Sequence, residues 1–425
     1  MKSAKIISFI ALTLTGLVFV SQSVQAGGLD LYEISTPDVG LASAGSAAGA
    51  QDASTIFKNP AGMSLLDGPQ LNSTLQALYG NVKFSGNSKT LPGGNGDNAI
   101  GALPGASLFV AYPVTKKLTL GFGTFSYFGL AEDYGNSWSG RYYVQKATLL
   151  GMSLMPAASF KVNDWLSVGG GLNAMYGYLD AQTAVNNLLP GVPDGQMTIK
   201  NHVWGFGGNA GIMIQPVEGT RIGVNYLSQV DLNFSAKPGF TGLGPGLGAA
   251  LANPPQLDLG MTVPQAVMVG VYQEINTNWA VMADVGWQQW SKFGEVAVGV
   301  NTANTANSKD LTTQLNYDDT WHGAIGAQYR ASEQWRFTGG FAYDTSAVSD
   351  ANRTVTVPMG AAYRMGVGAF WKVSQTVDLG AAYELAWSGN LPVTQGTSGS
   401  YRGEVSGSYN NACFNFFSVN LNWRF

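Results

Sequence analysis

The chain has 425 residues; 11% of them are Asp, Glu, Lys or Arg, 12% are aromatic, 56 are glycine, and the formal net charge is -4. Soluble domains carry about 25% charged residues, so the composition disfavours an ordinary soluble domain. The chain has no surplus of basic residues, which argues against nucleic acid as a partner. Beyond Gln25, no apolar run reaches the roughly 18 residues that a transmembrane helix needs. Low charge with many glycines and aromatics is typical of a transmembrane β-barrel.

The N-terminus has the three parts of a secretory signal peptide. Met1–Lys5 is basic, Ile6–Val20 is apolar, and Val24–Ala26 ends in a small residue. We therefore predict a cleaved signal peptide over residues 1–26. The only cysteine is Cys413, so an internal disulfide is not available to the exported chain.

The stretch from Gly27 to about Leu66 is the only long part of the mature chain that lacks a strand-and-turn pattern. It contains a run of small residues over 41–50, Pro37, which suits a helix start, and the turn signal Asn59–Pro60. Runs of Ala and Ser let short helices pack closely. We predict a compact, mostly helical plug, called the hatch, over residues 27–69, inside a barrel formed by residues 70–425.

Short polar segments and longer loops alternate through the rest of the chain. Six short segments each join two strand-like runs, at 113–117, 161–164, 215–219, 274–278, 331–334 and 372–375. Longer segments rich in Gly, Asn and Pro lie between them. Short turns at one rim and long loops at the other are the layout of an outer-membrane barrel, and the count gives about fourteen strands.

The strand-like runs alternate between apolar and polar residues. The last run places Phe417, Val419, Leu421, Trp423 and Phe425 on one face. A β-sandwich core would also use such aromatics, but a closed barrel explains the missing charge better, because lipid contact forbids open sheet edges. The predicted fold class is all-β and transmembrane: a fourteen-stranded antiparallel outer-membrane β-barrel with the hatch in its lumen.

One departure from the alternation lies in Leu118–Gly129. The apolar set changes parity between Phe122 and Phe125, with Gly121 and Gly123 at the change. Such a slip predicts a bulge or kink that interrupts the ladder. From periodicity alone, a harmless bulge near a rim explains it equally well.

A second departure lies in Leu149–Met155, where both faces are apolar. A porin lumen would be wet and charged, so an inward apolar face that includes Met152 and Leu154 indicates a greasy cavity. Tight packing against the hatch would produce the same pattern.

Motifs for catalysis, metals or nucleotides are missing. His202 and His322 each lie in a strand pattern without a neighbouring nucleophile or ligand spacing. The glycine-rich run Gly239–Gly248 follows no βαβ pattern and lacks a phosphate-loop lysine. We therefore predict a protein that is not an enzyme and uses no cofactor or metal.

Four stretches together resemble the FadL-type family of outer-membrane transporters for long-chain fatty acids and other hydrophobic compounds. They are Asn59–Ala61, Phe128–Tyr142, Asp284–Phe293, and Gly340–Asp344 followed by Arg353. Each stretch alone is a weak signal, but their order and spacing make the resemblance specific. It covers nearly the whole mature chain.

The resemblance implies a fourteen-stranded barrel in which outer loops capture the ligand, a lumen pocket near the hatch N-terminus binds it, and a gap at a kinked third strand releases it sideways. Carried over by position, the ligand-contacting N-terminus is Gly27, Gly28 and Leu29, and the hatch segment facing the gap is Asn59, Pro60 and Ala61. The gap itself lies at Gly121, Phe122, Gly123 and Phe125. The loop over residues 237–263 supplies a capture groove with Phe240, Leu243, Leu247, Leu251 and Leu257, unless it is a disordered apolar linker.

Arg364 is a further candidate for ligand binding. Many relatives have an acid soon after the proline that follows the conserved arginine, whereas this chain has Pro358, Met359 and Gly360. The missing acid would leave Arg364 as an unpaired cation that could hold a carboxylate. Arg141 and Lys146 have no better support than surface charge.

We therefore predict passive uptake of hydrophobic small molecules, such as long-chain fatty acids or hydrocarbons, by a monomer in the outer membrane of a Gram-negative bacterium. The predicted partners are that ligand (a fatty acid, detergent or hydrocarbon), outer-membrane lipid, and the barrel assembly machinery, which would bind the strand ending at Phe425. The alternatives are an outer-membrane lipid hydrolase, which needs a nucleophile and base near one rim, and an adhesin or general porin.

Overall fold

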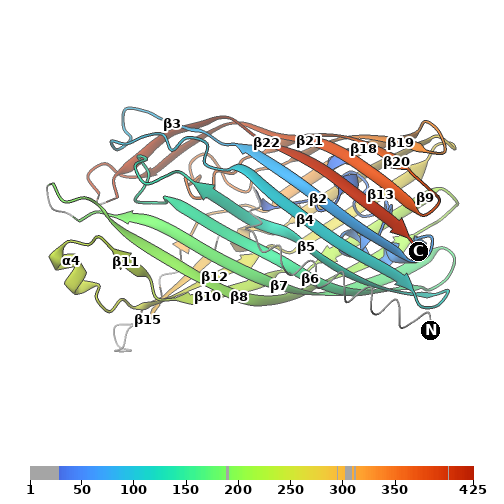
Figure 1. Ribbon diagram of the computed structural model, residues 1–425, viewed down its shortest axis with the longest axis horizontal. Coiled ribbons are helices and arrows are strands. Elements are labelled where there is room, and N and C mark those ends of the chain that lie inside the picture. The colour runs from blue at the N-terminus through green and yellow to red at the C-terminus, as the bar shows by residue number, and fades with distance from the viewer. Residues whose placement is uncertain (1–27, 188–190, 294, 302–308, 311–312, 401) are drawn as a thin grey trace.

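The computed structural model describes residues 28–187, 191–293, 295–301, 309–310, 313–400 and 402–425, so the predicted signal peptide and Gly27 lie outside the described residues. Fourteen antiparallel strands form a closed barrel, as the sequence predicts (Figure 1). They are β2 (Gln70–Asn81), β4 (Gly101–Pro113), β5 (Leu118–Asp133), β6 (Lys146–Lys161), β7 (Leu166–Val185), β8 (Gly195–Ile214), β9 (Thr220–Leu227), β13 (Ala266–Glu274), β14 (Trp279–Gln288), β18 (Thr320–Arg330), β19 (Trp335–Asp344), β20 (Ala362–Lys372), β21 (Val377–Gly396) and β22 (Glu404–Arg424). The barrel closes where β2 pairs with both β4 and β22.

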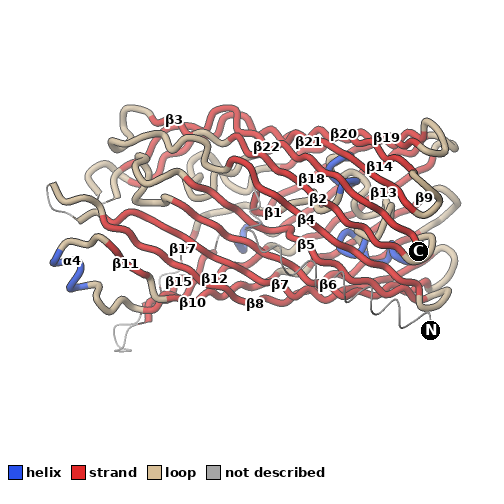
Figure 2. Tube along the Cα trace, in the orientation of Figure 1, coloured by secondary structure: helices blue, strands red, loops and turns tan. Residues whose placement is uncertain are grey.

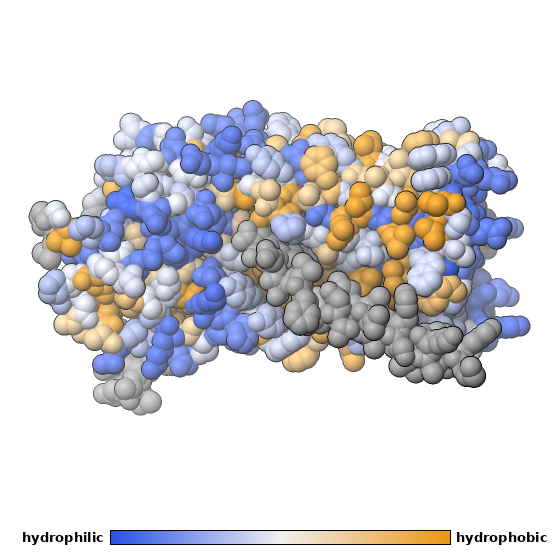
Figure 3. All heavy atoms as spheres, viewed as in Figure 1, coloured by the Kyte–Doolittle hydropathy of each residue, from blue (hydrophilic) through white to orange (hydrophobic). Residues whose placement is uncertain are grey.

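Alternating side chains face opposite environments along each strand. In β19, Trp335, Phe337 and Phe341 are more than 40% exposed on the outside, whereas Thr338 and Ala342 point inward and are buried. Figure 3 shows apolar residues gathered over the part of the barrel nearer the short turns, with a hydrophilic rim at that end and a long hydrophilic region at the other. The apolar band is the surface that contacts lipid, and the end with the long loops projects beyond it.

The long loops form structure of their own at the outer end. They contain β3 (Phe84–Gly86), which pairs with β22, and β11 (Gly239–Thr241), which pairs with β8. A second sheet consists of β10 (Val230–Ala236), β12 (Gln256–Val263), β15 (Glu295–Asn301), β16 (Lys309–Asp310) and β17 (Thr313–Gln314). Two short helices, α4 (Pro245–Ala250) and α5 (Trp290–Phe293), complete this region.

The hatch lies inside the barrel, as predicted from its small residues (Figure 2). It consists of β1 (Gly28–Asp30), α2 (Thr36–Leu41), α3 (Thr55–Lys58) and the 3-10 helix η1 (Pro60–Leu65), joined by turns. Among the described residues, no helix is long and apolar enough to cross a membrane.

The start of α2 is held by a local hydrogen-bond pattern. Pro37 stands in its first turn, and the Ser35 backbone N–H donates to Asp38 Oδ2 over 3.0 Å. Burial raises the pKa of the Asp38 carboxyl, and the ammonium of Lys58, 2.7 Å from Asp38 Oδ1, opposes that rise. The pair links α2 to α3, so the two helices of the hatch form one unit.

Glycines on the inner face of the wall let the hatch backbone approach closely. A Cβ at Gly340 would lie 1.8 Å from the Leu41 carbonyl oxygen, and one at Gly223 would lie 1.9 Å from the Ala47 carbonyl oxygen. Any side chain at these positions would collide with hatch backbone. The wall and the hatch are therefore fitted to one another.

Polar side chains of the wall satisfy hatch backbone groups. The buried Asp284 of β14 accepts hydrogen bonds from the backbone N–H groups of Gly45 and Ala47, the latter over 3.0 Å. Three strands away in the wall, Asn209 Nδ2 of β8 donates to the carbonyl oxygens of Ile56 and Phe57, both over 2.9 Å. These bonds fix the hatch to the wall at two separate strands.

Replacing Asp284 with Ala should loosen the hatch without opening the barrel. The change leaves the N–H groups of Gly45 and Ala47 unpaired, and an unsatisfied buried donor costs about 1–3 kcal/mol. Hydrogen exchange on the purified protein should speed up for residues 43–50 and stay unchanged in the barrel strands. Asp231→Ala, at an exposed site on β10, is the matched control. Equal exchange in the two variants would contradict the anchoring role.

Candidate functional site: a lumen cavity beside the N-terminal segment

The wall of the barrel is incomplete between β4 and β5. Their ladder runs from the pair Pro113–Thr119 to the pair Leu108–Thr124 and ends there. Both strands continue beyond this last pair without bonding to each other. Beyond that point β4 still pairs with β2, and β5 still pairs with β6. The edges that β4 and β5 present to each other are not paired to one another there. We call this unpaired stretch the β4–β5 gap.

Residues 28–34, called the N-terminal segment, cover the gap from inside. β1 pairs with β5 at Phe128 and Gly129, and the Leu31 N–H donates to the Tyr127 carbonyl oxygen over 2.7 Å. On the other side, Ser107 Oγ of β4 donates to the Ile34 carbonyl oxygen over 2.6 Å. The segment is therefore bonded to both edges of the gap. Gly28 and Leu29, two of the predicted site residues, lie in this covering strand.

The irregularity in β5 is real but lies further along than the sequence indicated. The register against β6 is regular up to Ser126 and shifts between Ser126 and Phe128, not at Gly121–Phe125. A Cβ at Gly121 would lie 2.5 Å from Met63 Sδ of the hatch, and one at Gly123 would lie 2.8 Å from Phe109. The apolar pattern therefore changes parity because the inward positions of Gly121 and Gly123 carry no side chain. The hatch and Phe109 occupy that space.

The two phenylalanines of this stretch face opposite sides. Phe122 points outward and is half-buried, whereas Phe125 is buried in the lumen. The ring of Phe125 lies 5.3 Å from that of Phe109 and 4.8 Å from that of Phe57 in the hatch. Phe57 and Phe125, rather than the predicted hatch motif, thus meet beside the gap.

The hatch motif Asn59, Pro60 and Ala61 contacts the wall at β6 to β8 instead of facing the gap. Asn59 Nδ2 donates to the Ile212 carbonyl oxygen over 3.0 Å, and Ser159 Oγ donates to the Ala61 carbonyl oxygen over 3.1 Å. The expected position facing the gap is therefore wrong. The amide of Asn59 needs backbone partners on both sides, and the glycine-rich inner face of β7 and β8 admits it.

Met152 and Leu154 lie on the outer face of β6, 44% and 40% exposed, and do not line the lumen. The inward residues are Ser153 and Met155, both fully buried. The lipid-facing side of this strand accounts for one of the two apolar faces, so the assignment of Met152 and Leu154 to a greasy cavity is corrected.

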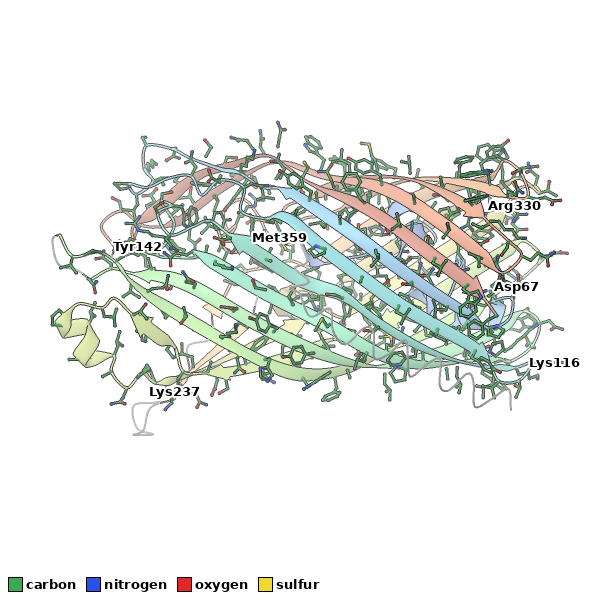
Figure 4. The ribbon with its side chains drawn as sticks, in the orientation of Figure 1. Asp67, Lys116, Tyr142, Lys237, Arg330 and Met359 are labelled. Atoms are coloured by element: carbon green, nitrogen blue, oxygen red, sulfur yellow. The ribbon has the colours of Figure 1, made fainter. Side chains whose placement is uncertain are left out.

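A cavity of about 140 Å³ lies next to the N-terminal segment. Its lining is mostly apolar and includes Leu31 of that segment, Leu130, Trp290, Met359 and Phe414. Met359 lies inside the barrel outline, away from both rims (Figure 4). Asp344 and Arg364 form the polar end of the cavity.

Arg364 is not the unpaired cation that the sequence suggested. Its Nε donates to Asp344 of β19, and its Nη1 donates to Glu33 of the N-terminal segment and, over 3.3 Å, to Glu384 of β21. His322 Nδ1 lies 2.6 Å from Asp344 Oδ1. The prediction failed because the acids come from distant parts of the chain. Among the described residues, no group of His, Cys, Asp and Glu side chains is arranged to hold a metal ion.

The N-terminal segment also contacts this cluster through its aromatic residue. The ring centroids of Tyr32 and His322 are 4.4 Å apart, and the guanidinium of Arg364 lies 5.4 Å from the Tyr32 centroid. The segment thus touches the β4–β5 gap on one side and the charged cluster on the other.

A larger cavity of about 870 Å³ opens at the end of the barrel with the short turns, and we call it the vestibule. It is lined by charged side chains that include Arg221, Glu274, Arg336, Asp378 and Arg424. Figure 4 labels Asp67 and Arg330 at this end. Such a lining suits water and ions rather than an apolar ligand.

The predicted capture loop is ordered at the opposite end (Figure 1). Its five candidate residues are all half-buried: Phe240 in β11, Leu243, Leu247 and Leu251 in and around α4, and Leu257 in β12. Part of their apolar surface is accessible from outside. This disagrees with a disordered linker.

The fold and the cavity together define a class of outer-membrane barrels whose own N-terminal hatch fills the lumen. The model of the family described as outer membrane protein transport protein (OMPP1/FadL/TodX) matches residues 17–425. The chain therefore belongs to this family, whose members transport hydrophobic compounds across the outer membrane of Gram-negative bacteria. These members are transporters and channels, not enzymes.

Relatives of known name cover nearly the whole chain. It is 26% identical to outer membrane protein P1 of Haemophilus influenzae over 98% of this chain and 99% of the relative. It is 25% identical to the long-chain fatty acid transport protein of Escherichia coli O6:H1 over 86% of this chain and 89% of the relative.

Solved structures share the fold at lower identity. A Pseudomonas aeruginosa FadL homologue superposes with a TM-score of 0.83 at 20% identity and covers 94% of this chain and 100% of its own. The Ralstonia pickettii toluene transporter TbuX superposes with a TM-score of 0.66 at 22% identity and covers 93% of this chain and 99% of its own.

Proposed function

We propose that the protein takes up compact hydrophobic molecules passively, binds them in the 140 Å³ lumen cavity and releases them sideways into the membrane through the β4–β5 gap. One observation carries this proposal: the N-terminal segment is both a wall of the cavity, through Leu31 and Tyr32, and the inner cover of the gap, through its bonds to Tyr127 and Ser107. A single displacement of this segment would join the cavity to the gap.

The entry of the ligand needs no energy source. An aromatic group of about 150–250 Å² that leaves water gains about 4–6 kcal/mol at about 25 cal/mol per Å². The half-buried apolar residues of the loop, among them Phe240 and Leu247, offer a first contact, and the mostly apolar lumen cavity offers more. The ligand then moves down its concentration gradient.

Release through the vestibule is the less favourable route. A ligand on that path would have to pass the hatch, which Asp284 and Asn209 tie to the wall at β14 and β8, and then enter the charged vestibule. The lateral route passes from an apolar cavity to lipid and keeps the ligand out of water. The geometry therefore favours lateral release.

The size of the cavity favours a ligand of single-ring size. A cavity of about 150 Å³ is enough to hold benzene, and this one measures about 140 Å³. A long-chain fatty acid would fit only after the N-terminal segment had moved. Toluene, which the name of the TbuX transporter gives as its ligand, suits this volume better than the long-chain fatty acid in the name of the Escherichia coli relative.

A reversible cross-link across the gap tests lateral release. Ala106 and Ser126 are the outward residues just beyond the last β4–β5 pair, and Cys413→Ser removes the native thiol. A reducible bifunctional maleimide that joins Ala106→Cys to Ser126→Cys should lower toluene uptake by cells severalfold, and reduction should restore it.

The matched control joins Val110→Cys to Phe122→Cys, a pair already held by the intact ladder. This cross-link should leave uptake unchanged. If both cross-linked proteins take up toluene as fast as the unlinked ones, the ligand does not leave through the gap and the lateral route is wrong.

A further inference from the structure

The loop between β19 and β20 folds back into the barrel and forms one wall of the lumen cavity. Four consecutive residues of this loop line the cavity: Val357, Pro358, Met359 and Gly360. Figure 4 places Met359 inside the barrel outline, away from both rims. We call residues 353–360 the cap. The cap belongs to no strand of the barrel, so its position depends on other contacts.

Arg353 ties the end of the cap to β21. The residue is 4% exposed, and its Nε donates to the Met359 carbonyl oxygen over 2.7 Å. Its Nη1 donates to the Pro392 carbonyl oxygen of β21 over 2.7 Å and to Asp350 Oδ1 over 2.6 Å. The planar guanidinium fixes the directions of these bonds. The backbone of Met359 is therefore held at a defined place relative to the barrel wall.

Val355 anchors the first part of the cap. It is fully buried, and its carbonyl oxygen accepts a hydrogen bond over 2.9 Å from the hydroxyl of Tyr134, which directly follows β5. The Val355 N–H donates to Gln395 Oε1 of β21 over 3.0 Å. At the other end of the cap, a Cβ at Gly360 would lie 2.4 Å from Leu391 Cδ2. The cap is thus bonded to two parts of the wall and packed closely against β21.

The side chain of Met359 can change its shape while its backbone stays in place. Methionine is unbranched and flexible, and it fills irregular gaps. Met359 is half-buried and is the longest side chain that the cap contributes to the cavity. Because the cavity measures only about 140 Å³, a small change in this side chain changes the size of the largest ligand that fits.

We infer that Met359 sets the upper size limit of the ligand and that Arg353 is the residue that positions it. The inference rests on the proposed function, because it concerns the same cavity. Ala in place of Met359 would remove Cγ, Sδ and Cε from the cavity wall and make room for a second fused ring. Phe would fill more of the space instead. Loss of the Arg353 bonds would free the cap to move aside for a larger ligand.

Toluene and naphthalene are suitable probes because both are neutral and apolar and differ mainly in size. Their uptake should be measured in cells that make the full chain, and the uptake by cells without it should be subtracted. Met359→Ala should raise the ratio of naphthalene to toluene uptake severalfold, and Met359→Phe should lower it. Met365→Ala is the matched control, since Met365 is 53% exposed on the outer face of β20, and it should leave the ratio unchanged.

Arg353→Met tests the positioning role. It keeps a long apolar side chain but removes every donor, so the ratio should rise as it does in Met359→Ala. Arg353→Lys keeps the charge and a donor and should restore part of the size limit. Arg402→Met, at an exposed site in an outer loop, should leave the ratio unchanged. Adding Met359→Ala to Arg353→Met should raise the ratio by less than the product of the two separate effects, because both act through one side chain.

The outcomes separate this inference from the proposed function. If Met359→Ala, Met359→Phe and Met365→Ala all give the ratio of the parent protein, Met359 does not limit the size of the ligand, while the proposed cavity and gap stand. If Arg353→Met lowers the uptake of both compounds by the same factor, Arg353 supports only the fold and the positioning role is wrong. If cells with the parent protein take up neither compound faster than cells without it, the proposed function is wrong and the size limit is lost with it.

Discussion

Replacing Arg364 with Met is expected to destabilise the folded protein by about 3–5 kcal/mol, because it leaves buried carboxylates without their cation. Glu33, Asp344 and Glu384 would then face one another in the lumen with only His322 as a basic neighbour. Since Glu33 belongs to the N-terminal segment, repulsion should push that segment away from β21. The same change should therefore loosen the cover of the β4–β5 gap.

Two measurements check this expectation. Urea unfolding in detergent should give the loss of stability, and hydrogen exchange should speed up over residues 31–34. Arg424→Met is the control, because Arg424 pairs with Asp378 over 2.6 and 3.0 Å at the partly exposed rim. Exposed ion pairs contribute about 0–1 kcal/mol, so the control should unfold almost like the parent protein. If both variants lose the same stability, the cluster at Arg364 contributes no more than a surface pair.

The barrel could be predicted from the sequence because lipid and lumen impose a strict period of two. Phe417, Val419 and Leu421 were expected on one face, and they are 52%, 52% and 38% exposed on the outside of β22. The six short turns also lie where the polar segments indicated. Strands can cross a membrane only as a closed barrel, so the alternation of apolar and polar residues is enough to predict the fold.

The site could not be predicted in the same way, because it is assembled from elements that only register brings together. Arg364 stands directly opposite Ala342 and Ala386; Asp344 is two residues after Ala342, and Glu384 is two residues before Ala386. Diagonal pairs of this kind can be found only when the strand register is known. The sequence carries one signal for this cluster: by strand alternation, Arg364, Asp344 and Glu384 all occupy inward positions.

Glycine explains why the sequence misplaces the bulge in β5. Gly121 and Gly123 interrupt the apolar alternation because the hatch and Phe109 occupy the space of their side chains, so the bulge was assigned too early in β5. Whether a glycine marks a bulge or a close contact depends on the residues that face it, and the sequence does not show those residues. The hatch itself was recognised, but its contacts to β6, β7 and β8 through Asn59–Ala61 were not.

Replacing Gly340 with Val is expected to detach α2 of the hatch from the wall while the barrel stays closed. The new Cβ would lie 1.8 Å from the carbonyl oxygen and 2.2 Å from the carbonyl carbon of Leu41. Backbone atoms cannot rotate out of the way as the end of a side chain can, so the cost should reach or exceed the roughly 1–3 kcal/mol of ordinary overpacking. Val suits a strand, so β19 itself should fold.

A detached hatch should let water and ions into the lumen, because the inward side chains that it covers are largely polar. They include Asn72, Asn209 and Asn225, and Asp284 with its two hatch hydrogen bonds. Conductance in planar bilayers should therefore rise from near zero to that of an open pore, and protease added from the side of the short turns should cut the hatch. Gly323→Val is the control, because a Cβ there meets no atom within 4 Å. If the Gly340→Val barrel conducts as little as the control, α2 can move aside within the lumen and the seal does not depend on this contact.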